Sequence, residues 1–146
     1  MDSIEIITSE KQAMEEDKLG CSLYTDATVE LEELIANLAS LLNASVKGLY
    51  VENAEGYICV DKNDEFDEQM RRDGEDGFLY YRYLIEVEPN KELGEENAVA
   101  FVSKILRYLW SEDYPATAAC AYEDALPNKG KLIPENHSWN EYYVWK

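Results

Sequence analysis

The sequence predicts a two-layer α+β sandwich, in which a mainly antiparallel sheet carries two helices on one face. Two amphipathic helical segments predict it, together with strand segments whose apolar residues alternate with polar ones. The chain has 146 residues, about the length of one domain, and its 46% apolar content is enough for one core. We therefore expect a single domain over residues 1–146.

The first 20 residues combine a short apolar alternation with a charged run, which predicts either a strand and a helical turn or a loosely packed N-terminal arm. A short strand then runs from Cys21 to a turn at Asp26. Thr28 is the expected N-cap of the first helix, because threonine is favoured there. Apolar residues with helical spacing predict one buried face, and they are Leu31, Leu34, Ile35, Leu38, Leu41 and Leu42.

After Asn43 the apolar period changes from helical to alternating. Residues 46–51 and 57–60 flank a turn-forming segment at 53–56, which predicts a β-hairpin. A longer strand is expected over Phe78–Glu88, with Leu79, Tyr81, Tyr83, Ile85 and Val87 on its packed face. Pro89 ends this strand, because proline has no amide hydrogen for a sheet ladder.

A second helix is expected from about Glu95. Its predicted buried face consists of Ala98, Phe101, Val102, Ile105, Leu106 and Leu109. An apolar strand over Thr117–Tyr122 follows, and the tail over 127–146 either adds an edge strand or covers the core with its aromatic residues. This element order favours a ferredoxin-like arrangement of the sandwich.

The charge excludes some partners. The sequence has 31 acidic and 13 basic residues, a formal net charge of −18. Nucleic acids and anionic membranes are bound by clustered lysine and arginine, so neither is an expected partner. Residues 1–60 carry 12 acidic and 3 basic side chains, residues 61–96 carry 13 and 5, and residues 97–146 carry 6 and 5. The acidity therefore precedes residue 97, which favours a one-sided acidic surface that attracts a basic protein.

The sequence predicts a cytoplasmic protein without a membrane span. No basic segment followed by an apolar run precedes Leu19, and no stretch approaches the roughly 18 apolar residues of a spanning helix. The three cysteines, Cys21, Cys59 and Cys120, are widely spaced and lack the paired spacing of zinc or redox sites. We expect them to be reduced and buried.

An acidic run over Asp61–Asp76 holds eight carboxylates, which are Asp61, Asp64, Glu65, Asp67, Glu68, Asp73, Glu75 and Asp76. A calcium loop beginning at Asp61 would place Phe66 where glycine is required and Arg72 where the bidentate glutamate is required. We therefore expect no metal site and interpret the run as a solvated acidic loop. Together with Tyr80 and Arg82, on the outer face of the expected strand, these carboxylates are the candidate contact residues for a partner.

Catalytic and cofactor motifs are absent from the sequence. The glycines fit neither phosphate-binding pattern, and the single histidine, His137, has no nucleophile signature nearby. Glu123 and Asp124 follow a predicted strand, where sites often form, although a loop-capping role is the simpler interpretation. The candidate residues of an alternative pocket are Glu123, Asp124 and His137, and we expect no cofactor and no catalytic residue.

Three functions remain open. The first is an interaction protein that binds a basic protein through its acidic face, and in size and charge the chain is similar to the small acidic immunity and antitoxin proteins of bacteria. The second is a small enzyme or ligand-binding domain with a carboxylate-containing pocket. The third is a structural subunit that forms homo-oligomers. Of these, the sequence favours the non-enzymatic interaction protein.

Overall fold

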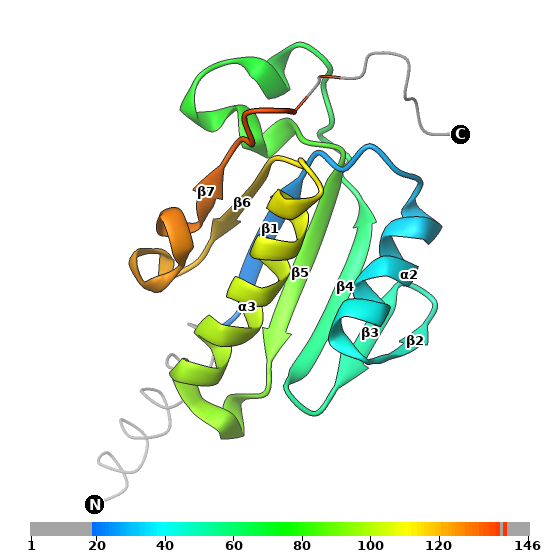
Figure 1. Cartoon of the computed structure of the whole chain (residues 1–146), viewed down its shortest axis with the longest axis vertical. Coiled ribbons are helices and arrows are strands. Elements are labelled where there is room, and N and C mark those ends of the chain that lie inside the picture. The colour runs from blue at the N-terminus through cyan, green and yellow to red at the C-terminus, as the bar shows by residue number, and fades with distance from the viewer. Residues whose placement is uncertain (1–18, 138, 140–146) are drawn as a thin grey trace, which may run out of the picture.

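The computed structural model describes residues 19–137 and residue 139, and these residues form one antiparallel sheet (Figure 1). The strand order in this sheet is β2-β3-β4-β5-β1-β6-β7. The strands are β1 (Cys21–Thr25), β2 (Ser45–Lys47), β3 (Tyr50–Asn53), β4 (Gly56–Lys62), β5 (Tyr83–Pro89), β6 (Ala116–Ala119) and β7 (Lys131–Leu132). The N-terminal arm falls largely outside the described residues, as do the tail aromatics Tyr142 to Trp145.

Two helices cover one face of this sheet, as the sequence predicts (Figure 1). Helix α2 (Leu31–Leu42) packs against β3 and β4, and helix α3 (Gly94–Ser111) packs against β5 and β6. Among the described residues, no helix has both the length and the apolarity needed to cross a membrane. The predicted α+β class, an antiparallel sheet with helices on one face, is confirmed.

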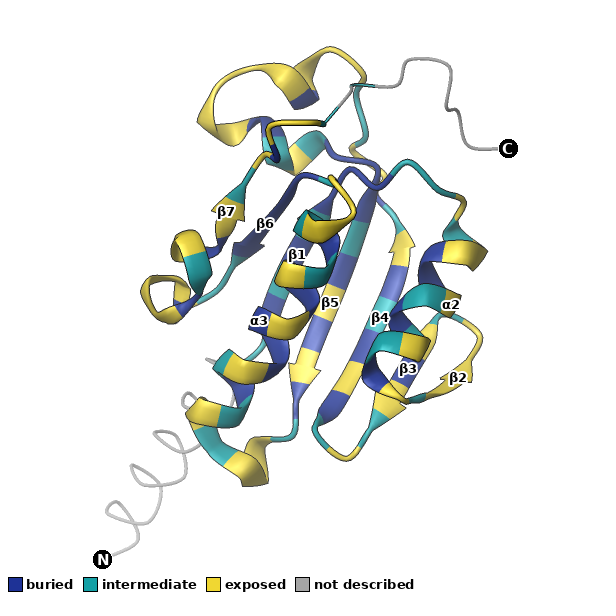
Figure 2. Ribbon diagram, in the orientation of Figure 1, coloured by how far each residue is buried: buried dark blue, intermediate teal, exposed yellow. Residues whose placement is uncertain are grey.

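The core lies between the helices and the sheet (Figure 2). Strands β1, β4 and β5 bury alternate side chains, because successive residues of a strand point to opposite faces. From the sheet, the core includes Leu23, Ile58, Val60, Tyr83, Ile85 and Val87. All six residues predicted for the buried face of the second helix are buried, from Ala98 to Leu109. The first helix buries Leu34, Ile35, Leu38 and Leu42 and ends at Asn43, which adopts the left-handed conformation common after helices.

The sheet has more strands than a ferredoxin-like fold has. Strands β2 and β3 extend it beyond β4, and β7 extends it beyond β6, so the full seven-strand order is not that of a four-stranded ferredoxin-like sheet. The additions come from the predicted hairpin, which has a third strand, and from the tail, which contributes β7. The interpretation of the tail as an edge strand is thus correct at residues 131–132.

Four predicted element boundaries are wrong. The strand expected over residues 46–51 is divided by a turn at 48–49 into β2 and β3, and β3 extends into the expected turn at Asn53. Helix α2 begins at Leu31 with Glu30 as its N-cap residue, so Thr28 does not cap it. The last apolar strand covers residues 116–119 instead of 117–122. The expected strand over Phe78–Glu88 begins only at Tyr83, because a 3-10 helix over Glu75–Tyr80 precedes it. The Tyr81 amide donates to the Phe78 carbonyl, and the Arg82 amide donates to the Asp26 side chain. Neither amide therefore takes part in the hydrogen bonds between strands.

Candidate functional site

Among the described residues, no α-helix covers the sheet face opposite α2 and α3, and we call it the open face. Its side chains come from the strand positions that alternate with the core positions, and the exposed or half-buried ones include Ser22, Tyr24, Tyr50, Glu52, Tyr57, Cys59, Asp61, Leu84, Glu86 and Glu88. Tyr50 and Tyr57 are 53% and 42% exposed, and their ring centroids lie 6.1 Å apart. The open face therefore combines exposed tyrosines with carboxylates.

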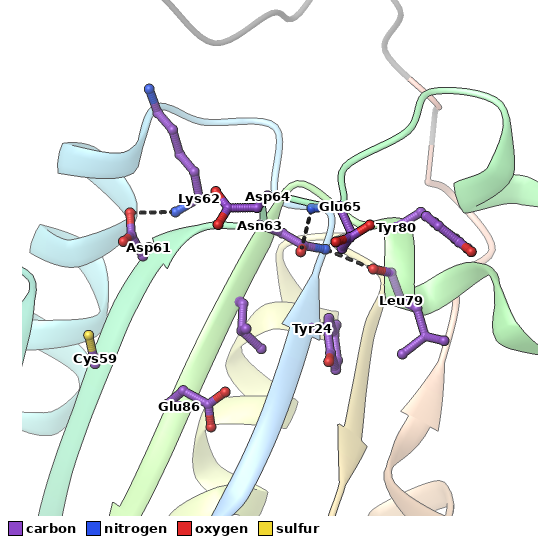
Figure 3. Close-up of a pocket in the computed structure, with 11 residues that line it drawn as sticks. Tyr24, Cys59, Asp61, Lys62, Asn63, Asp64, Glu65, Leu79, Tyr80 and Glu86 are labelled. Atoms are coloured by element: carbon purple, nitrogen blue, oxygen red, sulfur yellow. Dashed lines mark hydrogen bonds between the residues drawn. The ribbon is translucent and has the colours of Figure 1, made fainter.

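At one end of the open face lies a depression that we call the acidic hollow (Figure 3). Its volume is about 590 Å³, and it is lined by Tyr24, Cys59, Asp61, Lys62, Asn63, Asp64, Glu65, Leu79, Tyr80, Leu84 and Glu86. Four of these residues are carboxylates and one is a lysine. Burial and the charge of Glu86 raise the pKa of Tyr24, so its phenol stays protonated and can donate a hydrogen bond.

One wall of the acidic hollow is the chain between β4 and β5, residues 63–82, which we call the acidic lobe. The nearly buried Asn63 organises its base: Nδ2 donates to the carbonyls of Leu79 (2.9 Å) and Tyr81 (2.8 Å), and Oδ1 accepts from the Glu65 amide (3.1 Å). Asp67 caps the turn that follows, accepting from the amides of Gln69 and Met70 at 2.9 Å each. Seven of the eight carboxylates of the run are exposed, as expected of a solvated acidic loop, and the lobe also has a hydrogen-bonded interior.

The acidic lobe joins the sheet through a buried ionic group that we call the Asp26 cluster, made of Asp26, Arg71, Arg82 and His137. Asp26 follows β1, and its Oδ2 accepts from Nη1 of Arg71 at 2.8 Å and from Nη1 of Arg82 at 3.4 Å. Its Oδ1 accepts from the Arg82 amide at 3.0 Å. The side chains of Asp26, Arg71 and Arg82 are fully buried. One carboxylate thus lies between two guanidinium groups.

Aromatic rings complete the surroundings of the Asp26 cluster. The guanidinium carbons of Arg71 and Arg82 lie 5.4 and 5.6 Å from the centroid of Phe66, and that of Arg71 lies 5.2 Å from the centroid of Trp139. Such contacts stabilise cations where water is excluded. Arg71 Nη2 is buried without a hydrogen-bond acceptor in the part of the chain that the structure describes. Arg71 and Arg82 therefore share the Asp26 carboxylate, and Arg71 uses only part of its donor capacity on it.

Burial dominates the protonation behaviour of the Asp26 cluster. Burial raises the pKa of Asp26, against the opposing effects of Arg71 and Arg82. Burial likewise lowers the pKa of Arg82, although Asp26 opposes the shift. His137 Nδ1 lies 2.8 Å from the Asp113 carbonyl, which only accepts, so Nδ1 carries the proton. His137 Nε2 lies 4.0 Å from Asp26 Oδ2, and burial lowers the pKa of this imidazole.

The structure brings together some of the predicted contact residues and separates others. Asp61, Asp64, Glu65 and Tyr80 line the acidic hollow, and the other carboxylates of the run lie on the acidic lobe as Asp67, Glu68, Asp73, Glu75 and Asp76. The expected exposure of Arg82 is wrong, because its side chain is fully buried against Asp26. Leu79, expected in the core, is 38% exposed and lines the hollow.

The alternative pocket residues are not neighbours. Glu123 accepts a hydrogen bond from the Cys120 amide (3.1 Å), next to the last residue of β6, which agrees with a loop-capping role. His137 lies at the other end of β6, where the Asp26 amide donates to the Pro115 carbonyl (3.0 Å). The four residues of β6 span about 10 Å. Glu123 and the exposed Asp124 therefore share no site with His137.

Sequence reasoning missed the buried role of Asp26 and Arg71. Asp26 resembled an ordinary turn residue, and Arg71 lay within a strongly acidic run. The sequence feature that could have indicated a buried ion pair was the pair of adjacent arginines, Arg71 and Arg72, within the run of eight carboxylates. No group of three or more histidine, cysteine, aspartate or glutamate side chains among the described residues has an arrangement that could hold a metal ion.

His137 gives the structure a pH dependence that can be measured. Its pKa is lowered below the ordinary value of 6.5, so on acidification the unfolded chain binds a proton before the folded chain does. Between pH 7.5 and 5.5 we expect the wild type to lose up to about 1 kcal/mol of unfolding free energy that His137→Gln does not lose. The loss levels off below the folded-state pKa. Urea denaturation at several pH values measures it.

Because the sequence has one histidine, the variant removes every imidazole titration in this pH range. Equal pH dependence of the two proteins would show that the His137 environment is the same in the folded and unfolded chains.

Comparisons with known proteins add no functional assignment. Neither protein-family models, nor curated protein sequences, nor solved structures give a match to this chain. The class of the protein is therefore set by its architecture: an α+β sandwich with an open, acidic and tyrosine-bearing sheet face.

Proposed function

We propose that this protein is a small interaction protein that binds a basic protein partner through the open face and the acidic hollow. The observation that supports the proposal most directly is that Asp61, Asp64, Glu65 and Tyr80 line one depression together with Tyr24 and Glu86. Tyrosine is enriched among the residues that anchor protein interfaces, and carboxylates steer cationic partners. The partner fitting this hollow would present a lysine or arginine side chain to it.

The second depression on the open face supports the same proposal. Ser45, Lys47, Tyr50, Glu52 and Tyr57 line a volume of about 340 Å³ on β2, β3 and β4. It lies on the same sheet face as the acidic hollow, so a single partner surface can contact both. Blocking a basic enzyme in this way is the activity of an immunity or antitoxin-like inhibitor, and we propose that role for this chain. An inhibitor of this kind acts without chemistry of its own.

We further propose that the sheet is an elaborated ferredoxin-like fold and that the protein is cytoplasmic. The four central strands have the order β4-β5-β1-β6, with α2 connecting β1 to the β2–β4 meander and α3 connecting β5 to β6. This is the order of the two split βαβ units in a ferredoxin-like sheet. The three free cysteines support a reducing compartment.

The test compares two variants with the same change in charge. Asp64→Lys/Glu65→Lys reverses two exposed carboxylates of the acidic hollow, whereas Glu33→Lys/Glu112→Lys reverses two exposed ones near Tyr108 on the helix layer. Each immobilised protein is incubated with native lysate of the source cells at low and high salt. We expect the wild type and the helix-layer variant to retain one basic protein, and the hollow variant to retain at least tenfold less of it.

The retained protein should be released as salt rises, because exposed charges are screened beyond about 10 Å at 0.1 M salt. Equal retention by the hollow variant, or binding that does not change with salt, would reject the proposal. Retention of an acidic protein instead of a basic one would also reject the proposal.

A further inference from the structure

Two of the three cysteines are direct neighbours across the sheet. Cys21 is the first residue of β1, and Cys120 directly follows the last residue of β6. The antiparallel register pairs Ser22 with Ala119, so the next step places Cys21 opposite Cys120. Directly opposite residues of antiparallel strands have Cα atoms about 4.5–5.5 Å apart, within the range that a disulfide spans.

The two thiols act on each other's pKa, and their exposure differs. Cys21 is 3% exposed, whereas Cys120 is half-buried. The neighbouring Cys21 thiol lowers the pKa of Cys120, and the Tyr122 backbone lowers it further, against burial and Glu123. The same pairing and burial raise the pKa of Cys21. Cys120 is therefore the more nucleophilic and the more accessible thiol.

The backbone around both cysteines is held in place. The Cys120 amide donates to Glu123 Oε2 at 3.1 Å, and the Tyr122 hydroxyl donates to the Leu19 carbonyl at 2.7 Å. The second bond joins the chain two residues before Cys21 to the chain two residues after Cys120. These bonds hold the backbone positions of Cys21 and Cys120 next to each other.

We propose that Cys21 and Cys120 form an oxidative modification site, at which a neutral hydroperoxide converts the two thiols into an intramolecular disulfide. This activity is separate from partner binding, because both cysteines project from the helix-covered side of the sheet and the third cysteine, Cys59, lies on the open face.

The chemistry proceeds in two balanced steps. The Cys120 thiolate attacks one peroxide oxygen, the O–O bond breaks, and the leaving oxygen takes up a proton to become water, or an alcohol when the peroxide is organic. Cys120 is then a sulfenic acid. Cys21 attacks the Cys120 sulfur, the S–S bond forms, and the S–O bond breaks with loss of water that carries the Cys21 proton. Overall, two thiols lose two electrons to the peroxide.

The charges around the site favour a neutral oxidant. The negative charge of Glu86 raises the pKa of Cys21, and the negative charge of Glu123 raises the pKa of Cys120. The same carboxylates repel anionic reagents such as glutathione disulfide. Hydrogen peroxide carries no charge and avoids this repulsion.

The experiment uses the reduced full chain and hydrogen peroxide, with Cys59→Ser as the matched control because Cys59 is also half-buried. We expect the wild type and Cys59→Ser to lose two mass units, to give a Cys21–Cys120 peptide pair, and to melt about 5–15 °C higher after oxidation. Oxidised glutathione at equal concentration should react at least tenfold more slowly.

Two further variants test the roles of the thiols. In Cys21→Ala we expect Cys120 to accumulate as a sulfenic acid that a dimedone probe labels. In Cys120→Ala we expect at least tenfold less label on Cys21. A disulfide that includes Cys59, a disulfide between two chains, or an unchanged mass in the wild type would overturn the proposal. Since these readings concern the wild type, they hold even if a variant does not fold.

Discussion

Replacing Asp26 with asparagine is expected to lower the free energy of unfolding by about 3–5 kcal/mol. Asp26 is the carboxylate between Arg71 and Arg82, and all three side chains are fully buried. Its removal takes away the carboxylate that both guanidinium groups share, and breaking a buried ion pair by removing one partner is among the most destabilising changes a protein can undergo. Urea denaturation at pH 7 measures the loss.

The stability of an Arg71 variant can be compared with that of Asp26→Asn, because two guanidinium groups share the Asp26 carboxylate. Arg71→Met removes one of two cations, fills a similar volume and eliminates the buried Nη2 that lacks an acceptor among the described residues. Asp26 keeps its bonds to Arg82. We therefore expect Arg71→Met to be much less destabilising than Asp26→Asn, and the exposed Asp61→Asn to change stability by less than about 0.5 kcal/mol. Equal losses for the Asp26 and Arg71 variants would contradict this account of the cluster.

Replacing Asn63 with alanine is expected to lower the unfolding free energy by about 2–4 kcal/mol and to loosen the acidic lobe first. The Asn63 amide group donates to the carbonyls of Leu79 and Tyr81 and accepts from the Glu65 amide. Alanine leaves the two carbonyls without this donor, and each buried polar group left unpaired is destabilising by about 1–3 kcal/mol. Denaturation and amide hydrogen exchange at Tyr81 and Arg82 measure the effect.

Asn90→Ala is the matched control. Asn90 also donates from Nδ2 to a carbonyl, that of Ala54, and also accepts from a nearby amide, that of Glu92. Its bonds are exposed, so water replaces them and we expect a loss below about 1 kcal/mol. If Asn63→Ala and Asn90→Ala lose similar stability, or if exchange at Tyr81 stays slow in Asn63→Ala, the lobe does not depend on Asn63.

Periodic patterns predicted the helices and most of the sheet. The apolar spacing from Ala98 to Leu109 is helical throughout, so packing and local preference agree and every predicted face residue is buried. The alternation from Tyr83 to Val87 likewise gives the correct face of β5. The start of α2 was missed by the cap rule, because Glu30 occupies the cap position without a side-chain hydrogen bond.

Periodic sequence patterns could not predict the acidic lobe and the Asp26 cluster, because both depend on contacts between distant parts of the chain. Arg71 and Asp26 are 45 positions apart, and Arg82 and Asp26 are 56 apart. The alternating strand pattern continues in the sequence from Phe78 through Tyr81. The Arg82 amide nevertheless donates to the Asp26 carboxylate instead of to a neighbouring strand. A long-range ionic contact thus overrides a local strand pattern. Asp61, Asp64, Glu65 and Tyr80 line the hollow, and charge and residue type alone predicted them as contact residues.

The placement of β1 has a consequence for synthesis on the ribosome. Strand β1 is made early, but its hydrogen-bonding neighbours β5 and β6 lie much later in the chain, and Ser22 bonds to Glu86 across 64 positions. At translation rates of about 5–20 residues per second, the nascent β1 waits roughly 3–13 s before its first partner strand is made. Folding therefore cannot proceed from the N-terminus in order. During that interval the side chains of Leu23 and Cys21, which the folded protein buries, have no partner strand to cover them.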